Sequence, residues 1–481
     1  MKRLLGREKS DMRRIAVITL LVLTLSGCMV GPEYKRPSVD IPQSWHFEEK
    51  EAKGIVNIAW WQQFNDPVLN ELISIALREN KDLKIAAARV EEFIGKYAVT
   101  RASLFPQISA NASAERELTS YLVQVPIPAS APNPFTQYQV SLSASWEIDL
   151  WGKLRYATTA AHAELLSTEE ARRSVILSLV TSVANAYINL LNLDQQLDIA
   201  RRTAKLREES YNIFNIRFQA GYVSELELSQ AKSDLDQVLW TIPPLEKIIA
   251  QQENALCVLL GRNPGPISRG KALHDLQMPA IPAGVPSDLL EQRPDIRQAE
   301  QILIAANAQI GVARALYFPD ITLTGLFGWE STNLSSLFSG PARTWNWVVP
   351  FAAPIFTGGA IAGQVKEVEA IEKETLLQYQ QTIQNAFRDV EDSLVDQHRT
   401  EEQLEALARQ VEDLRTYARV ARLRYDNGYT SFIEVLDADR TLYVAELNYT
   451  QTKGALFQSL VNLYKAMGGG WIVTADELSK P

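Results

Sequence analysis

The residue with the clearest covalent chemistry is Cys28, which ends the run LSGC at 25–28. A basic segment and an apolar stretch over 15–25 precede it, and that stretch is too short to span a membrane as a helix. Diacylglyceryl transfer requires a small residue before the cleavage site and a thiol after it. The pattern therefore predicts a signal peptide at 1–27 and a lipid anchor on Cys28.

The alternative for this segment is an ordinary signal peptide with a chance cysteine. Translation begins at either Met1 or Met12, and Met12 opens the more typical signal. The residue after Cys28 is Met29 rather than aspartate, which by resemblance to bacterial lipoproteins favours the outer membrane. We expect the mature chain to be lipid-anchored there and to extend into the periplasm.

Motifs for catalysis and for metal binding are absent from the sequence. The four histidines and two cysteines show no zinc-ligand spacing, and Cys257 stands in an apolar stretch typical of a buried thiol. There is no phosphate-binding loop, HExxH or GxSxG motif. The net charge of -9 gives no basic surface for nucleic acid. We therefore expect no enzyme activity, cofactor or metal.

Two carboxylates, Glu434 and Asp437, stand three residues apart and so share one face of a predicted helix. Tyr425 and Asp426 precede them in the chain. One interpretation is that Asp437 pairs with Arg440, a surface interaction that contributes little. The other is a functional acidic site, which depends on the elements that position these residues.

One pattern occurs twice in the sequence. RFQAGYVSELEL at 217–228 matches RYDNGYTSFIEV at 424–435, and SLFPQI at 103–108 matches YFPDI at 317–321. Each copy is predicted to contain a helix, two strands, a very long helix, a glycine turn and a return helix. The two predicted repeats span residues 62–261 and 285–468.

Each Phe-Pro pair ends a helix, because proline disfavours the helical state in the residue before it. Alternating apolar and polar residues follow and predict strands. Runs of ~9–11 residues with one apolar face fit a tilted membrane strand, although a soluble half-buried hairpin has the same pattern. The predicted strands lie at about 107–117, 138–150, 320–330 and 343–356.

Two proline-free stretches predict helices of about 65 residues, roughly 100 Å long at 1.5 Å per residue. Steps of three and four residues mark a coiled-coil seam at Leu404, Leu407, Val411, Leu414, Ala418, Ala421 and Tyr425. The equivalent first-copy positions are Leu197, Ala200, Ala204, Arg207, Tyr211, Phe214 and Phe218. The predicted long helices cover about 153–220 and 361–427, and the return helices about 224–260 and 431–466.

Four strands per chain are too few to close a barrel. An open sheet edge in hydrocarbon leaves backbone groups unpaired, at several kcal/mol each, and known single-chain barrels start at eight strands. Several copies of the chain must therefore combine, and a closed ring is the usual arrangement.

These features resemble TolC-like outer-membrane efflux proteins, in the lipoprotein branch typified by OprM and NodT. The resemblance rests on LSGC at 25–28, GPEYKRP at 31–37, RPDIRQAE at 293–300, the doubled Phe-Pro pairs and the doubled glycine turns. It implies an α+β membrane fold: a trimeric twelve-stranded outer-membrane β-barrel, four strands per chain, continued by a long periplasmic α-helical coiled-coil barrel. An equatorial belt domain would comprise the lipidated N-terminal segment 28–61, the inter-repeat segment 262–284 and the C-terminal tail 469–481.

The resemblance also implies partners and a role. The partners would be two further copies, a periplasmic adaptor protein and an inner-membrane pump of the resistance-nodulation-division type. The chain would be a passive gated conduit that exports drugs or other small solutes. Alternatives are a duct for protein secretion, a monomeric porin or adhesin, and a periplasmic coiled-coil scaffold without a pore.

Two groups of site residues follow from the resemblance. The adaptor would contact the tip residues Arg217, Gly221, Ser224, Arg424, Gly428 and Ser431. A simpler interpretation makes Ser224 and Ser431 helix N-caps, each in a capping box with the glutamate three residues later. The pore gate would be lined by Glu434, Asp437, Tyr425 and Asp426, and a ring of such carboxylates would favour cations.

Overall fold

The computed structural model describes residues 29–42, 45, 59–120, 122, 132–280, 286–468 and 471–479. The predicted signal peptide and Cys28 lie outside these residues. The chain divides into two compact units, which we call the sheet unit and the helical unit. The sheet unit contains residues 1–38, 90–167 and 299–379, and the helical unit contains residues 39–89, 168–298 and 380–481.

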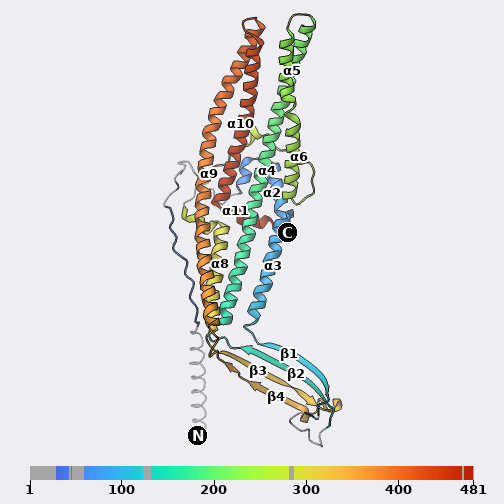
Figure 1. Ribbon diagram of the computed structural model, residues 1–481, viewed down its shortest axis with the longest axis vertical. Helices are drawn as coiled ribbons and strands as arrows, with labels where there is room; N and C mark the ends of the chain where they lie inside the picture. Colours follow the sequence, from blue (N-terminus) through green and yellow to red (C-terminus); the bar gives the residue numbers. More distant parts are fainter. Residues whose placement is uncertain are drawn as a thin grey trace, which may run out of the picture. The chain divides into compact units, whose positions relative to one another are not determined.

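The sheet unit is built on one antiparallel sheet with the strand order β1–β2–β3–β4 (Figure 1). The proline of each Phe-Pro pair directly precedes a strand, so that β1 begins at Gln107 and β3 at Asp320. A short fifth strand also pairs with β3. The strands are β1 (Gln107–Glu117), β2 (Phe135–Glu147), β3 (Asp320–Ser331), β4 (Arg343–Val348) and β5 (Phe351–Ala352).

Two predicted strands differ from the observed ones. β2 begins at Phe135 and ends at Glu147, so the predicted range 138–150 was placed too far toward the C terminus. The prediction of one strand over 343–356 was wrong, because pairing stops at Val348 and resumes only in β5. Pro350 explains the break, since proline has no N–H to donate to the ladder.

The register gives the two faces of the sheet different chemistry. Two neighbouring rows of paired residues on one face are Ile108, Ala144, Gly325 and Trp347, and Ala110, Leu142, Phe327 and Trp345. Two rows on the opposite face are Ser109, Ser143, Leu326 and Asn346, and Asn111, Ser141, Gly328 and Thr344. Because side chains alternate along a strand, one face is apolar across all four strands and the other is largely polar.

Two 67-residue helices, α4 and α9, run from the sheet unit into the helical unit (Figure 1). Each is followed by a turn and by helices that return along it. The helices are α2 (Pro67–Glu79), α3 (Lys81–Ala102), α4 (Lys153–Gln219), α5 (Glu225–Leu239), α6 (Ile242–Leu259), α7 (Leu289–Gln292), α8 (Pro294–Ala315), α9 (Ala360–Asp426), α10 (Phe432–Met467) and α11 (Trp471–Ser479).

The two return segments are not alike. The prediction of one helix over 224–260 was wrong, because α5 ends at Leu239 and α6 begins at Ile242. Pro243 and Pro244 cause the break, since proline is tolerated only in the first turn of a helix. No proline interrupts α10, which is continuous. The segment 469–481, predicted as a tail, contains the helix α11.

The predicted coiled-coil seam lies along the packed sides of both long helices. All seven seam positions on α9 are buried or partly buried, and so are those on α4 except Phe218, which is exposed. By length and composition α4 also contains a window apolar enough to cross a membrane, but 61% of that window is buried in the structure. The burial indicates a core helix.

An aromatic cluster joins distant segments within the helical unit. Trp60, in the 3-10 helix η1 (Trp60–Phe64), stacks on Tyr464 with ring centroids 5.2 Å apart. Trp471 of α11 packs edge-on against Trp60. The buried carboxylate of Asp66 caps α2 and accepts a hydrogen bond from the Tyr187 hydroxyl at 3.0 Å. The N-terminal and C-terminal parts of this unit therefore share one core.

Candidate functional site

Two glycine turns reverse the chain after α4 and α9. Gly221 has a φ of +78° and Gly428 a φ of +76°, as predicted, and glycine adopts this left-handed region without steric cost. In both turns the residue after the glycine donates its N–H to a carbonyl of the last helical turn, that of Arg217 or of Arg424, at 2.9 Å. This hydrogen bond closes a Schellman motif, so the two copies share one backbone geometry.

The helix caps differ between the two turns. The Ser224 hydroxyl accepts the N–H of Glu227, and the Glu227 carboxylate accepts the N–H of Ser224 at 2.8 Å, which confirms the capping box there. The Ser431 side chain makes no capping hydrogen bond, so the same prediction was wrong for the second turn. The physical reason is that the Glu434 carboxylate accepts the hydroxyl of Thr430 instead.

Aromatic rings from both repeats pack together behind the turns. The ring centroid of Phe214 on α4 lies 4.0 Å from that of Phe432 on α10, and Tyr425 on α9 lies 5.4 Å from Phe432. The Tyr425 hydroxyl accepts a hydrogen bond from Arg217 at 3.4 Å. These contacts bring both turns into one tip, on which the six predicted adaptor-contacting residues are all exposed.

The two carboxylates of the predicted gate stand at the start of α10. Asp437 is exposed and accepts a hydrogen bond from the Tyr417 hydroxyl at 3.4 Å, while Glu434 is partly buried. Arg440 lies 2.7 Å from Asp234, so the interpretation that Asp437 pairs with Arg440 was wrong. Among the described residues Asp437 forms no ion pair, which leaves its charge directed to solvent.

A buried ionic cluster next to the tip was not predicted as a site. Arg207 and Asp234 are 5% and 2% exposed and lie 3.0 Å apart, and Arg440 binds the same carboxylate. Arg422 lies 3.3 Å from Asp439, whose pKa is raised by burial, while burial lowers the pKa of Arg207. The cluster joins the first repeat to the second. Arg207 is the one charged residue among the predicted seam positions of α4 and α9, which are otherwise apolar or aromatic. This is the sequence feature from which the cluster could have been predicted.

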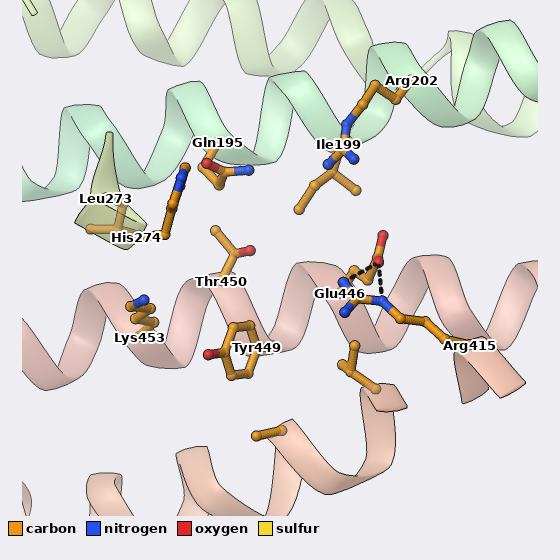
Figure 2. A pocket seen from close by; sticks show the side chains of 12 residues that line it. Gln195, Ile199, Arg202, Leu273, His274, Arg415, Glu446, Tyr449, Thr450 and Lys453 are labelled. Atoms are coloured by element: carbon orange, nitrogen blue, oxygen red, sulfur yellow. Dashed lines mark hydrogen bonds and ion pairs between the residues drawn. The ribbon is translucent and has the colours of Figure 1, made fainter. Parts of the chain in front are cut away.

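Two cavities in the helical unit are lined by α4, α9 and α10, and the second is lined by α5 as well. The first, of about 340 Å³, is also lined by the 3-10 helix η2 (Leu273–Asp275), and Arg415 pairs with Glu446 on its wall at 2.9 Å (Figure 2). The second, of about 570 Å³, is lined by Arg207, Asp234 and Asp439. Both cavities therefore have walls with charges of both signs.

The described part of the chain contains no group of three or more potential metal-ligating side chains. Cys257 is buried, as predicted, and its thiol donates a hydrogen bond to the carbonyl of Gly265 at 3.2 Å. The side chains gathered at the tip are therefore suited to electrostatic and packing roles.

Two curated relatives match almost the whole chain. TtgC of Pseudomonas putida, a probable efflux pump outer membrane protein, is 36% identical over 467 residues, which cover 94% of this chain and 95% of TtgC. SilC of Salmonella typhimurium, a probable outer membrane lipoprotein, is 34% identical over 468 residues, which cover 96% and 99%.

The fold agrees with these sequence matches. The crystal structure of the CmeC outer membrane channel of Campylobacter jejuni matches with a TM-score of 0.87 at 27% identity, over 94% of this chain and 98% of that one. The model of the outer membrane efflux protein family matches residues 72–262 and 285–469. The chain therefore belongs to the outer membrane efflux protein family.

Proposed function

We propose that the chain is the outer-membrane channel of a three-component efflux system. In this role it is a passive, gated conduit that carries drugs or other small solutes from the periplasm to the exterior. It assembles as a trimer and works with a periplasmic adaptor and an inner-membrane pump of the resistance-nodulation-division type. The pump supplies the energy, and the chain itself performs no catalysis.

The observation that carries this proposal is the two-faced sheet. On its apolar face Ile108, Trp345 and Trp347 are 73%, 64% and 66% exposed in the single chain. Exposed apolar surface of this extent needs a covering, and lipid covers one face of a membrane strand while water lines the other. The sheet therefore fits a barrel wall that faces lipid outside and solute inside.

The edges of the sheet support assembly from several copies. β1 and β4 are the outer strands of the four-strand order, and each has a neighbour on only one side. In a bilayer such edges must be paired. Three copies placed edge to edge would give twelve strands, in agreement with the number that the family resemblance implies.

Equivalent positions of the two repeats support the same assembly in the helical unit. Ile213 and Ile216 on α4 are exposed, and so are the residues 207 positions later on α9, Val420 and Leu423. A coiled-coil helix with apolar residues left exposed has room for a further helix. Because both repeats present the same surface, repeat 1 of one copy can pack against repeat 2 of the next.

The carboxylates of α10 support a cation-selective gate. Three copies would place three Glu434 and three Asp437 side chains around one axis, with Tyr425 and Asp426 beside them at the turn. Rings of carboxylates favour cations at a constriction. The exposure of Asp437 and its freedom from Arg440 leave its charge available for this purpose.

The exposed tip and the N terminus also have roles in the proposed channel, as the adaptor-contacting surface and the lipid anchor. The turns at Gly221 and Gly428 present one backbone shape twice per chain, and so six times per trimer, to an adaptor. Cys28 carries the lipid anchor, and the segments that share the aromatic core of the helical unit form the belt.

The test is the mass and pore activity of the mature protein, purified in detergent and placed in a planar lipid bilayer. We expect a trimer that inserts and passes small, cation-selective currents. A monomer without membrane affinity beyond its lipid would overturn the proposal and favour a periplasmic coiled-coil scaffold.

A further inference from the structure

The first cavity of the helical unit, of about 340 Å³, is lined by one face of each of three helices, α4, α9 and α10. On each helix the lining residues recur at steps of three and four, which places them on one face; on α10 they include Glu446, Thr450 and Lys453. The inter-repeat segment adds Leu273 and His274 of η2 (Figure 2). A conduit role assigns no function to this cavity.

Three polar side chains at the cavity have no partner within the described part of the chain. Lys453 forms no ion pair or hydrogen bond there, and the side chains of Thr450 and Gln195 form no hydrogen bond. Thr450 is only 5% exposed, whereas Thr441 of the same helix donates its hydroxyl to the carbonyl of Asp437 at 2.8 Å. Because buried polar groups in proteins are nearly always paired, these donors indicate a bound acceptor.

The charge that remains uncompensated at the cavity is positive. Arg415 lies 2.9 Å from Glu446, and Arg202 lies 3.0 Å from Asp198, so both guanidinium groups have a carboxylate partner. Lys453 is partly buried, and burial lowers its pKa. An anion beside this ammonium would favour its charged form, which burial disfavours. The acceptor indicated by the unpaired donors is therefore negatively charged.

The other main part of the wall is apolar. Ile199, Leu273 and Val411 are 4%, 2% and 5% exposed, and Tyr449 adds an aromatic ring. The volume is at the lower end of the range that small-molecule sites occupy, and such sites combine apolar walls with a few polar groups that orient the ligand. A small molecule with one apolar ring and one negative charge matches this wall.

We propose that the cavity is a binding site for a small carboxylate with an apolar body, of the size of a substituted benzoate. The carboxylate accepts hydrogen bonds from Lys453, Thr450 and Gln195, and the ring packs against Ile199 and Val411. The ligand contacts both repeats, because α4 belongs to the first repeat and α9 and α10 belong to the second. All the lining residues come from one chain, so binding requires neither a second copy nor pore activity.

The test uses para-trifluoromethylbenzoate as the probe and fluorine NMR of the mature protein in detergent, with protein-free micelles as the blank. In the wild type we expect the probe resonance to broaden and unlabelled benzoate to reverse the broadening. In Lys453→Met we expect the affinity to fall by at least about tenfold, since a charged hydrogen-bond donor is lost. In Thr450→Val, which loses one neutral hydrogen bond, we expect a fall of about threefold to tenfold.

Matched controls separate binding in the cavity from adsorption elsewhere. Lys465→Met removes an exposed lysine of α10 that does not line the cavity, and we expect the wild-type affinity. The neutral analogue para-trifluoromethylbenzyl alcohol should not bind. Thr450→Val keeps the test decisive if Lys453→Met folds poorly. Absence of binding to the wild type, equal affinity in the wild type and both cavity variants, or equally tight binding of the alcohol would overturn the carboxylate site.

Discussion

The two glycine turns share a backbone and differ in the chemistry of their side chains. Both have a left-handed glycine and the same Schellman hydrogen bond. In the first turn Glu227 is bound within a capping box, whereas in the second Glu434 is bound by Thr430 and Ser431 makes no cap. The two turns therefore share the geometry that reverses the chain and differ in how their glutamates are bound.

The largest effect is expected where the two copies are joined. Asp234→Ala removes the buried partner of both Arg207 and Arg440, and the loss of one member of a buried ion pair typically costs about 3–5 kcal/mol. We expect a loss of this size in the free energy of opening, measured by amide hydrogen exchange of α5 and α10.

Asp236→Ala is the matched control for that variant, because Asp236 is an exposed residue of the same helix. It is expected to change the free energy of opening by less than about 0.5 kcal/mol. Similar losses in the two variants would show that the buried cluster does not join the repeats.

The next effect tests the shared backbone of the two turns. Gly221→Ala and Gly428→Ala each force a side chain into the left-handed region, at a cost of about 1–2 kcal/mol. We expect equal losses in hydrogen-exchange protection at the ends of α4 and α9. Gly363→Ala, in an open part of α9, should instead stabilise its helix by up to ~1 kcal/mol. Unequal losses of protection at the two helix ends would show that the two turns do not share one backbone geometry.

A smaller effect tests the difference in capping. Ser224→Ala removes a cap that contributes about 1 kcal/mol, while Ser431→Ala removes a side chain that makes no capping hydrogen bond. We therefore expect the first helical turn of α5 to lose protection and that of α10 to remain unchanged. If both variants behaved alike, the described difference in capping would be incorrect.

The smallest effect on stability is expected from the predicted gate. Glu434→Gln combined with Asp437→Asn changes partly or fully exposed groups, so the free energy of unfolding should move by less than about 0.5 kcal/mol. In a planar bilayer the same variant should lose cation preference. Glu227→Gln in the first copy is the control and should retain it. Retained selectivity in the double variant would remove the gate assignment.

The sequence was informative wherever a single residue imposes a backbone constraint. The Phe-Pro pairs marked both strand entries, and Gly221 and Gly428 marked both reversals. Pro243 and Pro350 carried the same kind of information about breaks in a helix and in a strand, but the longer hydrophobic periodicity around them favoured one continuous element. At such points the proline, rather than the surrounding hydrophobic periodicity, determines where a helix or strand ends.

Side-chain partners were much harder to predict than elements. Arg440 stands three residues after Asp437, and sequence spacing alone favours that pair, yet Arg440 binds Asp234 from the other repeat. The hydrogen bonds of Tyr34 and Arg36 with Glu300 depend equally on the fold. Nothing in the run GPEYKRP at 31–37 indicates the run RPDIRQAE at 293–300 as its partner, because the two meet only through the tertiary packing of the chain.

The most direct test of the account addresses the two faces of β2. Single cysteines are introduced at Val140, Leu142 and Ala144 on one face, and at Ser143 and Ser145 on the other, and are labelled with a fluorophore in the membrane-inserted protein. The account predicts that brominated lipids quench the labels at 140, 142 and 144, whereas a water-soluble quencher reaches those at 143 and 145. Equal accessibility of the two sets to the water-soluble quencher, without lipid quenching, would contradict a membrane barrel.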